Sequence, residues 1–391
     1  MPFHEVTKMD QRRELARLAS APGANHAALA RAYGVNRKTV GKWAERFAAE
    51  GEAGLAQRSR RPRASPARTD LAVEAAVLAL REAHPAWGGR KLHHALKRAH
   101  GFAPSPSTVT EILRRNGVAL GALGGGRKPF VRFEKAAPNE LWQMDFKGHV
   151  ALGAGARLHP LTVLDDHSRF CLVLAACADQ RTQTVKSHLE HAFRAHGLPD
   201  AIITDNGSPW GDGPGSPFTP LGVWLIEHDV RIAHARPYHP QTMGKDERFH
   251  RTLDLELLRR RNFTAVEDAA RAFARWRGVY NRQRPHEAIG YAAPADRYRP
   301  SQRPYRKRVE PFFYGETDLV VRVAEGGRIR AYGRQFRAPK AFHAKHVAIR
   351  PAETDGLYAV FFRAVEIARF DRRTGKRHPP NLSTMSPNTC P

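Results

Sequence analysis

Hydrophobic positions near the start of the chain recur at helical spacing. Val40, Trp43 and Phe47 form an i, i+3, i+7 stripe, and a turn that carries Gly34 precedes it. A short helix, a tight turn and a helix with a basic outer face are typical of a helix-turn-helix unit. We predict such a unit over residues 1–55. A plain three-helix bundle with a solvated basic face is the alternative.

A second helical pattern covers residues 69–121. Leu71 and Leu78 belong to one apolar helix face, and Ser105 ahead of Pro106 is a usual helix start. This pattern predicts a second unit that resembles a helix-turn-helix. A structural adaptor that makes no DNA contact is the other interpretation.

The pattern changes between residues 139 and 300, where short apolar runs alternate with amphipathic helices. Three strands at 141–146, 159–164 and 170–176 form a predicted meander. The elements expected after it are helices at 182–196, 221–229, 242–258 and 266–281, and strands at 201–204 and 230–232. Antiparallel strands followed by alternating helices and strands predict an α/β core with a mixed sheet.

The remaining segments are assigned from turn signals and composition. Residues 301–373 carry short alternating runs with glycine turns, which predict a small β-barrel. Residues 56–68 and 122–138 are predicted linkers, and residues 374–391 a disordered tail. The first linker contains five arginines and can follow a phosphate backbone, although a solvated spacer would have the same composition. The fold class is therefore multidomain.

Composition and charge narrow the function classes. The chain of 391 residues carries 64 Lys and Arg against 38 Asp and Glu, a net charge of +26. Residues 1–138 have 25 basic and 11 acidic side chains, whereas residues 139–300 have 21 and 19. Basic flanks around a nearly neutral middle favour nucleic acid as the partner. The three cysteines cannot form a disulfide scaffold, and Cys171 and Cys177 are expected in the core on one strand face. We expect a cytosolic protein without a membrane span.

Three acidic residues in the neutral middle stand out by position. Asp145 lies near the end of the first predicted strand, Asp205 follows a buried strand, and Glu247 lies early in a long helix. Phosphodiester chemistry can use two divalent cations about 4 Å apart, held by converging carboxylates. Hard oxygen ligands suit Mg²⁺ or Mn²⁺. Neighbouring strand ends and a helix beside them can supply that arrangement.

Three motifs around these acids resemble a known family. Trp142-Gln143-Met144-Asp145, Thr204-Asp205-Asn206-Gly207-Ser208 and the Pro-Gln-x-x-Gly-Lys block at 240–245 with the helix that follows it look like the integrase core of insertion-sequence transposases and retroviral integrases. The resemblance implies an RNase H-like fold and an Asp-Asp-Glu catalytic triad of Asp145, Asp205 and Glu247. It also implies a DNA transposase that binds the terminal inverted repeats of its element and catalyses metal-dependent strand cleavage and transfer.

The spacing of the third acid departs from the family pattern. Asp205 and Glu247 are separated by 41 residues, more than usual, and the Gly- and Pro-rich loop after Asp205 accounts for the excess. Asp246 is the rival ligand. It aligns with Phe249 and Leu253 on the predicted buried face of the helix, so we assign it to the helix start, where an acid is favoured.

The expected partners are double-stranded DNA, both element ends and target, and further copies of the chain in an oligomer on DNA. We expect a bacterial cytoplasmic protein associated with the nucleoid. A DNA-binding regulator that has lost catalysis and an RNase H-type nuclease are the rival functions. The predicted DNA contacts are basic side chains of the first unit, the first linker and the long helix: Arg37, Lys38, Lys42, Arg46, Arg58, Arg60, Arg61, Arg63, Lys245, Arg248 and Arg251.

Overall fold

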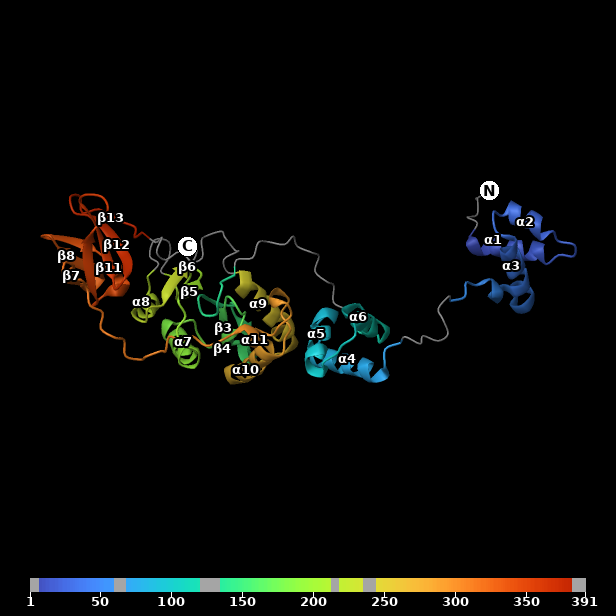
Figure 1. Cartoon of the computed structure of the whole chain (residues 1–391), viewed down its shortest axis with the longest axis horizontal. Helices are drawn as coiled ribbons and strands as arrows, with labels where there is room; N and C mark the ends of the chain where they lie inside the picture. The colour runs from blue at the N-terminus through green and yellow to red at the C-terminus, as the bar shows by residue number, and fades with distance from the viewer. Residues whose placement is uncertain (1–6, 60–67, 120–133, 212–217, 235–243, 382–391) are drawn as a thin grey trace. The chain divides into compact units, whose positions relative to one another are not determined.

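The computed structural model describes residues 7–59, 68–119, 134–211, 218–234 and 244–381. The chain divides into two compact units, Met1–Arg68 and Thr69–Pro391 (Figure 1).

The first unit has the predicted helix-turn-helix arrangement. It contains α1 (Lys8–Ala19), α2 (His26–Ala32), α3 (Arg37–Glu50) and a short 3-10 helix, η1 (Gly51–Leu55). The Asn36 side chain accepts from the backbone N–H of Lys38 and caps α3, as its position predicts. Val40, Trp43 and Leu55 are buried together, so the apolar stripe of α3 holds the unit together.

The second helical unit consists of α4 (Leu71–Ala83), α5 (Gly89–His100) and α6 (Pro106–Arg115). Ser105 caps α6 and Pro106 occupies its first turn, as predicted. Ile112 and Leu113 are fully buried in the centre of the unit. Leu71, by contrast, is 73% exposed and α4 buries Glu74 and Val77 instead, so its buried face is rotated from the predicted one.

The α/β core has the predicted mixed sheet. Its strands are β1 (Trp142–Phe146), β2 (Val150–Ala151), β3 (Arg157–Asp165), β4 (Cys171–Cys177), β5 (Ala201–Thr204) and β6 (Arg231–His234). They follow the order β4-β3-β1-β5-β6, and the short β2 also pairs with β3. β1, β3 and β4 are antiparallel, whereas β1, β5 and β6 are parallel. The carboxyl ends of β1 and β5 therefore meet at one edge.

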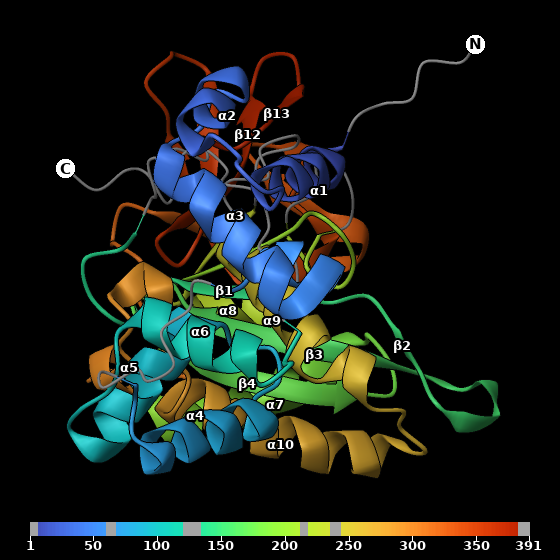
Figure 2. The same cartoon turned by 90° about the vertical axis from the view of Figure 1, so that its right-hand side faces the viewer.

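Helices cover both faces of this sheet. They are α7 (Thr182–His196), α8 (Pro220–Glu227), α9 (Gly244–Glu256), the short 3-10 helix η4 (Leu258–Arg260), α10 (Val266–Arg282) and α11 (Pro294–Arg297). α7 and α8 pack with Trp142 and Val163 in one cluster, while α9 and α10 pack with Leu158 and Leu164 in another. Figure 2 shows α10 beside β3 and β4.

The two core cysteines lie in opposite clusters, so the expectation that they share a strand face is wrong. Cys171 packs with α9 and α10, whereas Cys177 packs with α7. The register between β3 and β4 shifts after Val163, because β4 contains an extra residue there. Such a bulge reverses the alternation of side chains along the strand.

The C-terminal part is an open sheet, so the predicted closed barrel is not confirmed. β13 (Arg377–His378), β12 (Val365–Asp371), β11 (Leu357–Phe362), β10 (His346–Pro351) and β7 (Leu319–Arg322) pair in that order. A separate hairpin of β8 (Arg328–Ala331) and β9 (Arg334–Arg337) packs in the same apolar cluster, which also includes Val223 and Ile226 of α8. Closure needs pairing of the edge strands, and β7 and β13 do not pair with each other.

The predicted disorder from residue 374 is wrong for residues 374–381. There, β13 pairs with β12, and the backbone N–H of Asn381 donates to Glu366. Residues 382–391 lie outside the described part. Among the described residues, none of the helices has the length and apolar character needed to cross a bilayer.

Candidate active site

Two predicted catalytic acids lie on neighbouring parallel strands. Asp145 is on β1 and Asp205 directly follows β5. β1 pairs with β5 so that Trp142 faces Ile202 and Gln143 faces Ile203. Asp145 and Asp205 each lie two residues beyond the second of these pairs, and the charge of Asp205 acts on Asp145. Local strand propensity makes each strand, but only their parallel pairing brings the two carboxylates together.

The electrostatics of Asp145 reflect this proximity. Its pKa is raised to about 6, first by burial and then by the negative charge of Asp205. Its Oδ1 accepts from the backbone N–H of Phe146 at 2.8 Å, and Asp205 is exposed and accepts from that of Gly207 at 3.0 Å. Two neighbouring carboxylates of which one is costly to ionise are stabilised by a divalent cation.

The third predicted acid differs from its neighbour in exposure. Both lie in the first turn of α9, but Asp246 is fully buried and Glu247 is exposed. Successive helix residues point about 100° apart, so only one of the two can face the sheet. The assignment of Asp246 to the buried face is confirmed by its burial beside Phe249 and Leu253.

Asp246 belongs to a polar cluster that sequence reasoning missed. The Thr162 hydroxyl lies 3.1 Å from Asp246 Oδ1, 2.9 Å from His250 Nε2 and 3.0 Å from the backbone oxygen of Asp145. Thr162 is opposite Asp145 on β3. The cluster therefore ties the first turn of α9 to the two strands beneath the catalytic edge.

Burial strongly affects the titrating groups of this cluster. Burial and then the charge of Asp145 raise the pKa of Asp246 well above its usual value. Burial and then Lys147 lower the pKa of His250 to about 4. Ligand atoms of Asp145, Asp246 and His250 lie within 4.8 Å of one another. The i, i+4 spacing of Asp and His on α9 was a signal that could have suggested this contact.

The adjacent acids Asp165 and Asp166 are buried, although Asp166 lies in the turn that follows β3. Asp165 accepts from the backbone N–H of Asn139 and from both the backbone and the hydroxyl of Ser168. Asp166 accepts from the Gln143 amide at 2.9 Å and pairs with Lys245. These bonds satisfy both carboxylates inside the core.

The basic residues of α9 divide into two kinds. Lys245, predicted as a DNA contact, is largely buried and its ammonium pairs with Asp166, and burial lowers its pKa. Arg248 and Arg251 are exposed. Geometry thus gives Lys245 a place inside the core and leaves Arg248 and Arg251 accessible to a ligand.

The predicted DNA-contact residues of α3 lie on its outer face. Arg37, Lys38 and Lys42 are exposed, and Arg46 is half-buried. The Lys42 ammonium lies 4.4 Å from the centroid of the Trp43 ring, and the Arg46 guanidinium 5.5 Å. Arg58 is exposed and pairs with Glu50. Arg60, Arg61 and Arg63 lie outside the described residues.

The second helical unit packs against the α/β core through charged and aromatic side chains. The Arg98 guanidinium contacts both carboxylate oxygens of Asp296, at 2.5 and 2.9 Å. The Lys91 ammonium lies 4.0 Å from Glu256, and the His94 and Tyr291 rings stack with centroids 4.1 Å apart. Lys91 and Arg98 of α5 are therefore partnered by acids of the core.

Several family models match consecutive parts of the chain. An integrase core domain matches residues 135–240, and a second integrase core domain model matches residues 228–294. The C-terminal domain of the IS481 family transposase matches residues 318–378. A helix-turn-helix domain matches residues 11–63 and a homeodomain-like domain residues 39–113.

Similar proteins come from insertion elements and a virus. An uncharacterized 31.7 kDa protein of insertion element IS407 from Burkholderia multivorans is 28% identical over 237 residues, covering 60% of this chain and 83% of that protein. An uncharacterized 39.2 kDa protein of IS476 from Xanthomonas euvesicatoria is 27% identical over 247 residues, covering 62% and 69%. The structure of a simian T-cell lymphotropic virus intasome with a PP2A regulatory subunit has a TM-score of 0.37 at 16% identity, covering 74% and 98%.

Proposed function

Since the chain belongs to the insertion-sequence transposases with an integrase-type catalytic core, we propose that it binds the terminal inverted repeats of its element and catalyses strand cleavage and strand transfer. The observation that carries this proposal is the register that aligns Asp145 with Asp205 beside the first turn of α9. Its reaction class is metal-dependent polynucleotidyl transfer.

We propose Asp145, Asp205 and Glu247 as ligands of two Mg²⁺ or Mn²⁺ ions. The raised pKa of Asp145 supports a fit, because a cation would relieve the repulsion between its carboxylate and that of Asp205. When bound, such ions activate the attacking oxygen and stabilise the leaving oxygen of a phosphodiester. Carboxylate oxygens are the ligands that these ions prefer.

The chain's own residues position the reaction rather than attack the phosphate. Both described cysteines are unsuited to nucleophilic attack, since burial raises the pKa of Cys177 to about 11 and that of Cys171 still further. The Thr162–Asp246–His250 cluster fixes α9 against β1 and β3, and we propose that the exposed Glu247 of the same first turn supplies the third ligand. Asp246 is thus a positioning residue that holds α9 against the sheet.

We propose that the first unit recognises the element ends. Its DNA contacts are assigned to Arg37, Lys38, Lys42, Arg46 and Arg58, and Arg60, Arg61 and Arg63 extend them into the linker. Arg248 and Arg251 are proposed contacts of the core, whereas Lys245 would reach a phosphate only by leaving Asp166. We further propose a homo-oligomer on DNA in the bacterial cytoplasm, at the nucleoid.

Substitution of the proposed ligands tests the function. Asp145→Asn, Asp205→Asn and Glu247→Gln keep side-chain size but remove one negative ligand each, so cleavage and strand transfer on element-end DNA should fall below detection. DNA binding should survive. Asp246→Asn is the matched control and should retain activity, because its amide still accepts from Thr162. Chelation should abolish activity, and Mg²⁺ or Mn²⁺ should restore it.

Two results would contradict specific parts of the proposal. Retained strand transfer in Glu247→Gln together with its loss in Asp246→Asn would make Asp246 the third ligand. Full activity in all four variants would exclude this mechanism. End binding without any metal-dependent cutting would favour a regulator, and cutting without strand-transfer products would favour a nuclease.

A further inference from the structure

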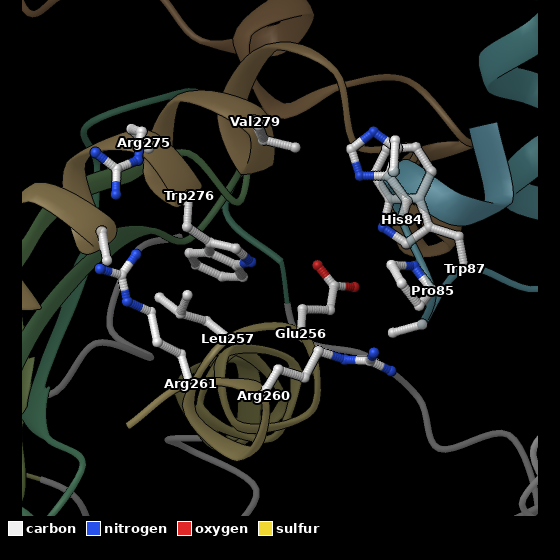
Figure 3. Close-up of a pocket in the computed structure, with 13 residues that line it drawn as sticks. His84, Pro85, Trp87, Glu256, Leu257, Arg260, Arg261, Arg275, Trp276 and Val279 are labelled. Carbon is white, nitrogen blue, oxygen red and sulfur yellow. The ribbon is translucent and has the colours of Figure 1, made fainter. Parts of the chain in front are cut away.

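A cavity of about 240 Å³ lies where the second helical unit meets the α/β core, away from the catalytic acids. Its walls come from the loop after α4, the end of α9 with η4, and one face of α10 (Figure 3). We call it the Trp276 cavity, after the ring that forms one of its walls.

Aromatic side chains line the Trp276 cavity on two sides. The Trp276 ring from α10 forms one side, with Leu257 and Val279 near it. On the other side lie Pro85 and the stacked pair of His84 and Trp87, whose ring centroids are 3.8 Å apart with planes 7° from parallel. A space bounded by flat rings suits a flat aromatic ligand.

A single carboxylate projects into this space. Figure 3 shows Glu256 pointing between Trp276 and the His84–Trp87 pair. Its Oε1 accepts from Arg284 Nε at 2.9 Å and lies 4.0 Å from the Lys91 ammonium. Glu256 is paired with both cations, so a ligand that meets its carboxylate must present a hydrogen-bond donor to it.

Arginines at the rim add positive charge. Arg275 lies beside Trp276, and Arg260 lies beyond Glu256 toward Pro85 (Figure 3). Burial and then the charge of Arg260 lower the pKa of Arg81, which donates to the backbone oxygen of Trp87. Arg260 and Arg275 belong to the lining of the cavity, and their positive charge attracts an anionic group of the ligand.

Together these features match a nucleotide. An aromatic ring can stack on a base, a carboxylate can accept from an exocyclic amino group, and guanidinium groups can bind phosphate. A base within a duplex cannot reach such a cavity, whereas an unpaired base can. Thymine fits less well, because its N3–H donor lies between two carbonyl oxygens, which a carboxylate repels.

We propose that the Trp276 cavity binds one unpaired nucleotide with an amino-bearing base, stacked on Trp276, recognised by Glu256 and neutralised by Arg260 and Arg275. The proposal rests on the proposed function in that the chain handles strands freed at DNA ends. It adds a second contact with DNA, chemically distinct from both the first unit and the catalytic acids.

Photo-crosslinking of the full-length protein tests the site directly. The probe is a short oligo-dC strand with one 5-iodo-dC, which couples to aromatic side chains on irradiation. The expected product is a cross-link on the peptide that contains Trp276 or Trp87, competed better by unlabelled oligo-dC than by oligo-dT of the same length. Cross-links found only in the first unit would overturn the proposal.

Matched variants separate stacking, recognition and charge. Trp276→Ala should weaken oligo-dC binding about five-fold or more, and Trp276→Phe should retain most of it and guard against misfolding. Glu256→Gln should remove the preference for oligo-dC over oligo-dT. An unchanged preference in Glu256→Gln together with unchanged affinity in Trp276→Ala would overturn the proposal.

The charge at the rim has a control on the same helix. Arg275→Gln should reduce the slope of log affinity against log salt by about 0.7, as expected for one lost phosphate contact on a single strand. Arg271→Gln removes the same charge one turn away, beside Asp268, and should leave the slope unchanged. Equal slopes in the two variants would contradict the assignment of Arg275.

The outcomes distinguish this inference from the proposed function. Loss of the cross-link at Trp276 with intact strand transfer would remove the nucleotide site alone. A cross-link at Trp276 in a protein that never cuts DNA would leave the site in place and remove the transposase mechanism.

Discussion

The two helical units share a local pattern but use their basic residues differently. In the first unit, Arg37, Lys38 and Lys42 lie exposed on the outer face of α3. In the second, Lys91 and Arg98 of α5 face acids of the core. The number of helices, their caps and their apolar stripes therefore did not predict in which unit the basic side chains are exposed.

A neighbouring domain can lower the attraction of a basic helix for DNA. A cation beside an acidic partner has already lost part of its attraction for phosphate, and burial adds a desolvation cost. Lys91 shows both effects, since burial first, then nearby cations, lower its pKa to about 8 despite Glu256. We interpret the second unit as docked on the core through α5, and the proposed reader of duplex element ends is the first unit.

The largest expected difference between the two helical units comes from their apolar cores. Leu113→Ala in the second unit and Leu55→Ala in the first each remove a fully buried leucine, and each should cost about 2–5 kcal/mol of unfolding free energy. Because the units are separate, Leu55→Ala should lose end binding and Leu113→Ala should keep it. Thermal unfolding measures the loss of stability, and binding titrations with element-end DNA measure the loss of affinity. Equal loss of end binding would make both units DNA readers.

Removal of basic side chains should lower DNA affinity in the first unit more than in the second. Arg37→Ala with Lys42→Ala should weaken binding to terminal-repeat DNA, by about 1–3 kcal/mol for each residue that contacts a base edge. Arg90→Ala with Arg98→Ala is the matched pair on α5 and should change affinity little, because both side chains face core acids. Fluorescence anisotropy at several salt concentrations provides the measurement. A comparable loss of affinity in both pairs would show that both helical units contact DNA.

The burial of Lys91 predicts that the free energy of unfolding depends on alkaline pH. Its pKa is about 8 in the folded chain and near 10.5 when unfolded, so the unfolded state binds more protons between these values. This group should therefore make the fold more stable as pH rises from 8 to 10.5, by about 1–3 kcal/mol. Denaturant unfolding of the native chain and of Lys91→Met isolates the contribution. A difference between them that does not change with pH would contradict it.

The smallest expected effect concerns the Arg98–Asp296 pair. Both side chains are partly exposed, so Asp296→Asn should lower the unfolding free energy by about 1 kcal/mol or less. The charge-exchanged double variant, Arg98→Asp with Asp296→Arg, should recover part of a single variant's loss. A double-mutant cycle measures this coupling. A coupling of zero would show that the pair does not help to dock the second unit.

The predicted elements were close to those observed where periodicity and caps agreed. The helix at 182–196 and the strand at 201–204 match α7 and β5. The prediction failed where pairing over long distances mattered, as with the open C-terminal sheet. Strand periodicity indicates which face is buried but cannot show whether edge strands meet.

The sequence by itself determined the helix-turn-helix cap at Asn36, the mixed-sheet core, the candidate acids and the basic flanks. These follow from local preferences and composition, which act over a few residues. The packing of the chain was needed to show that Asp145 and Asp205 interact, that Asp246 joins Thr162 and His250, and that Lys245 pairs with Asp166. Such contacts depend on how distant strands and helices pack, and burial then sets the charge and partners of each side chain.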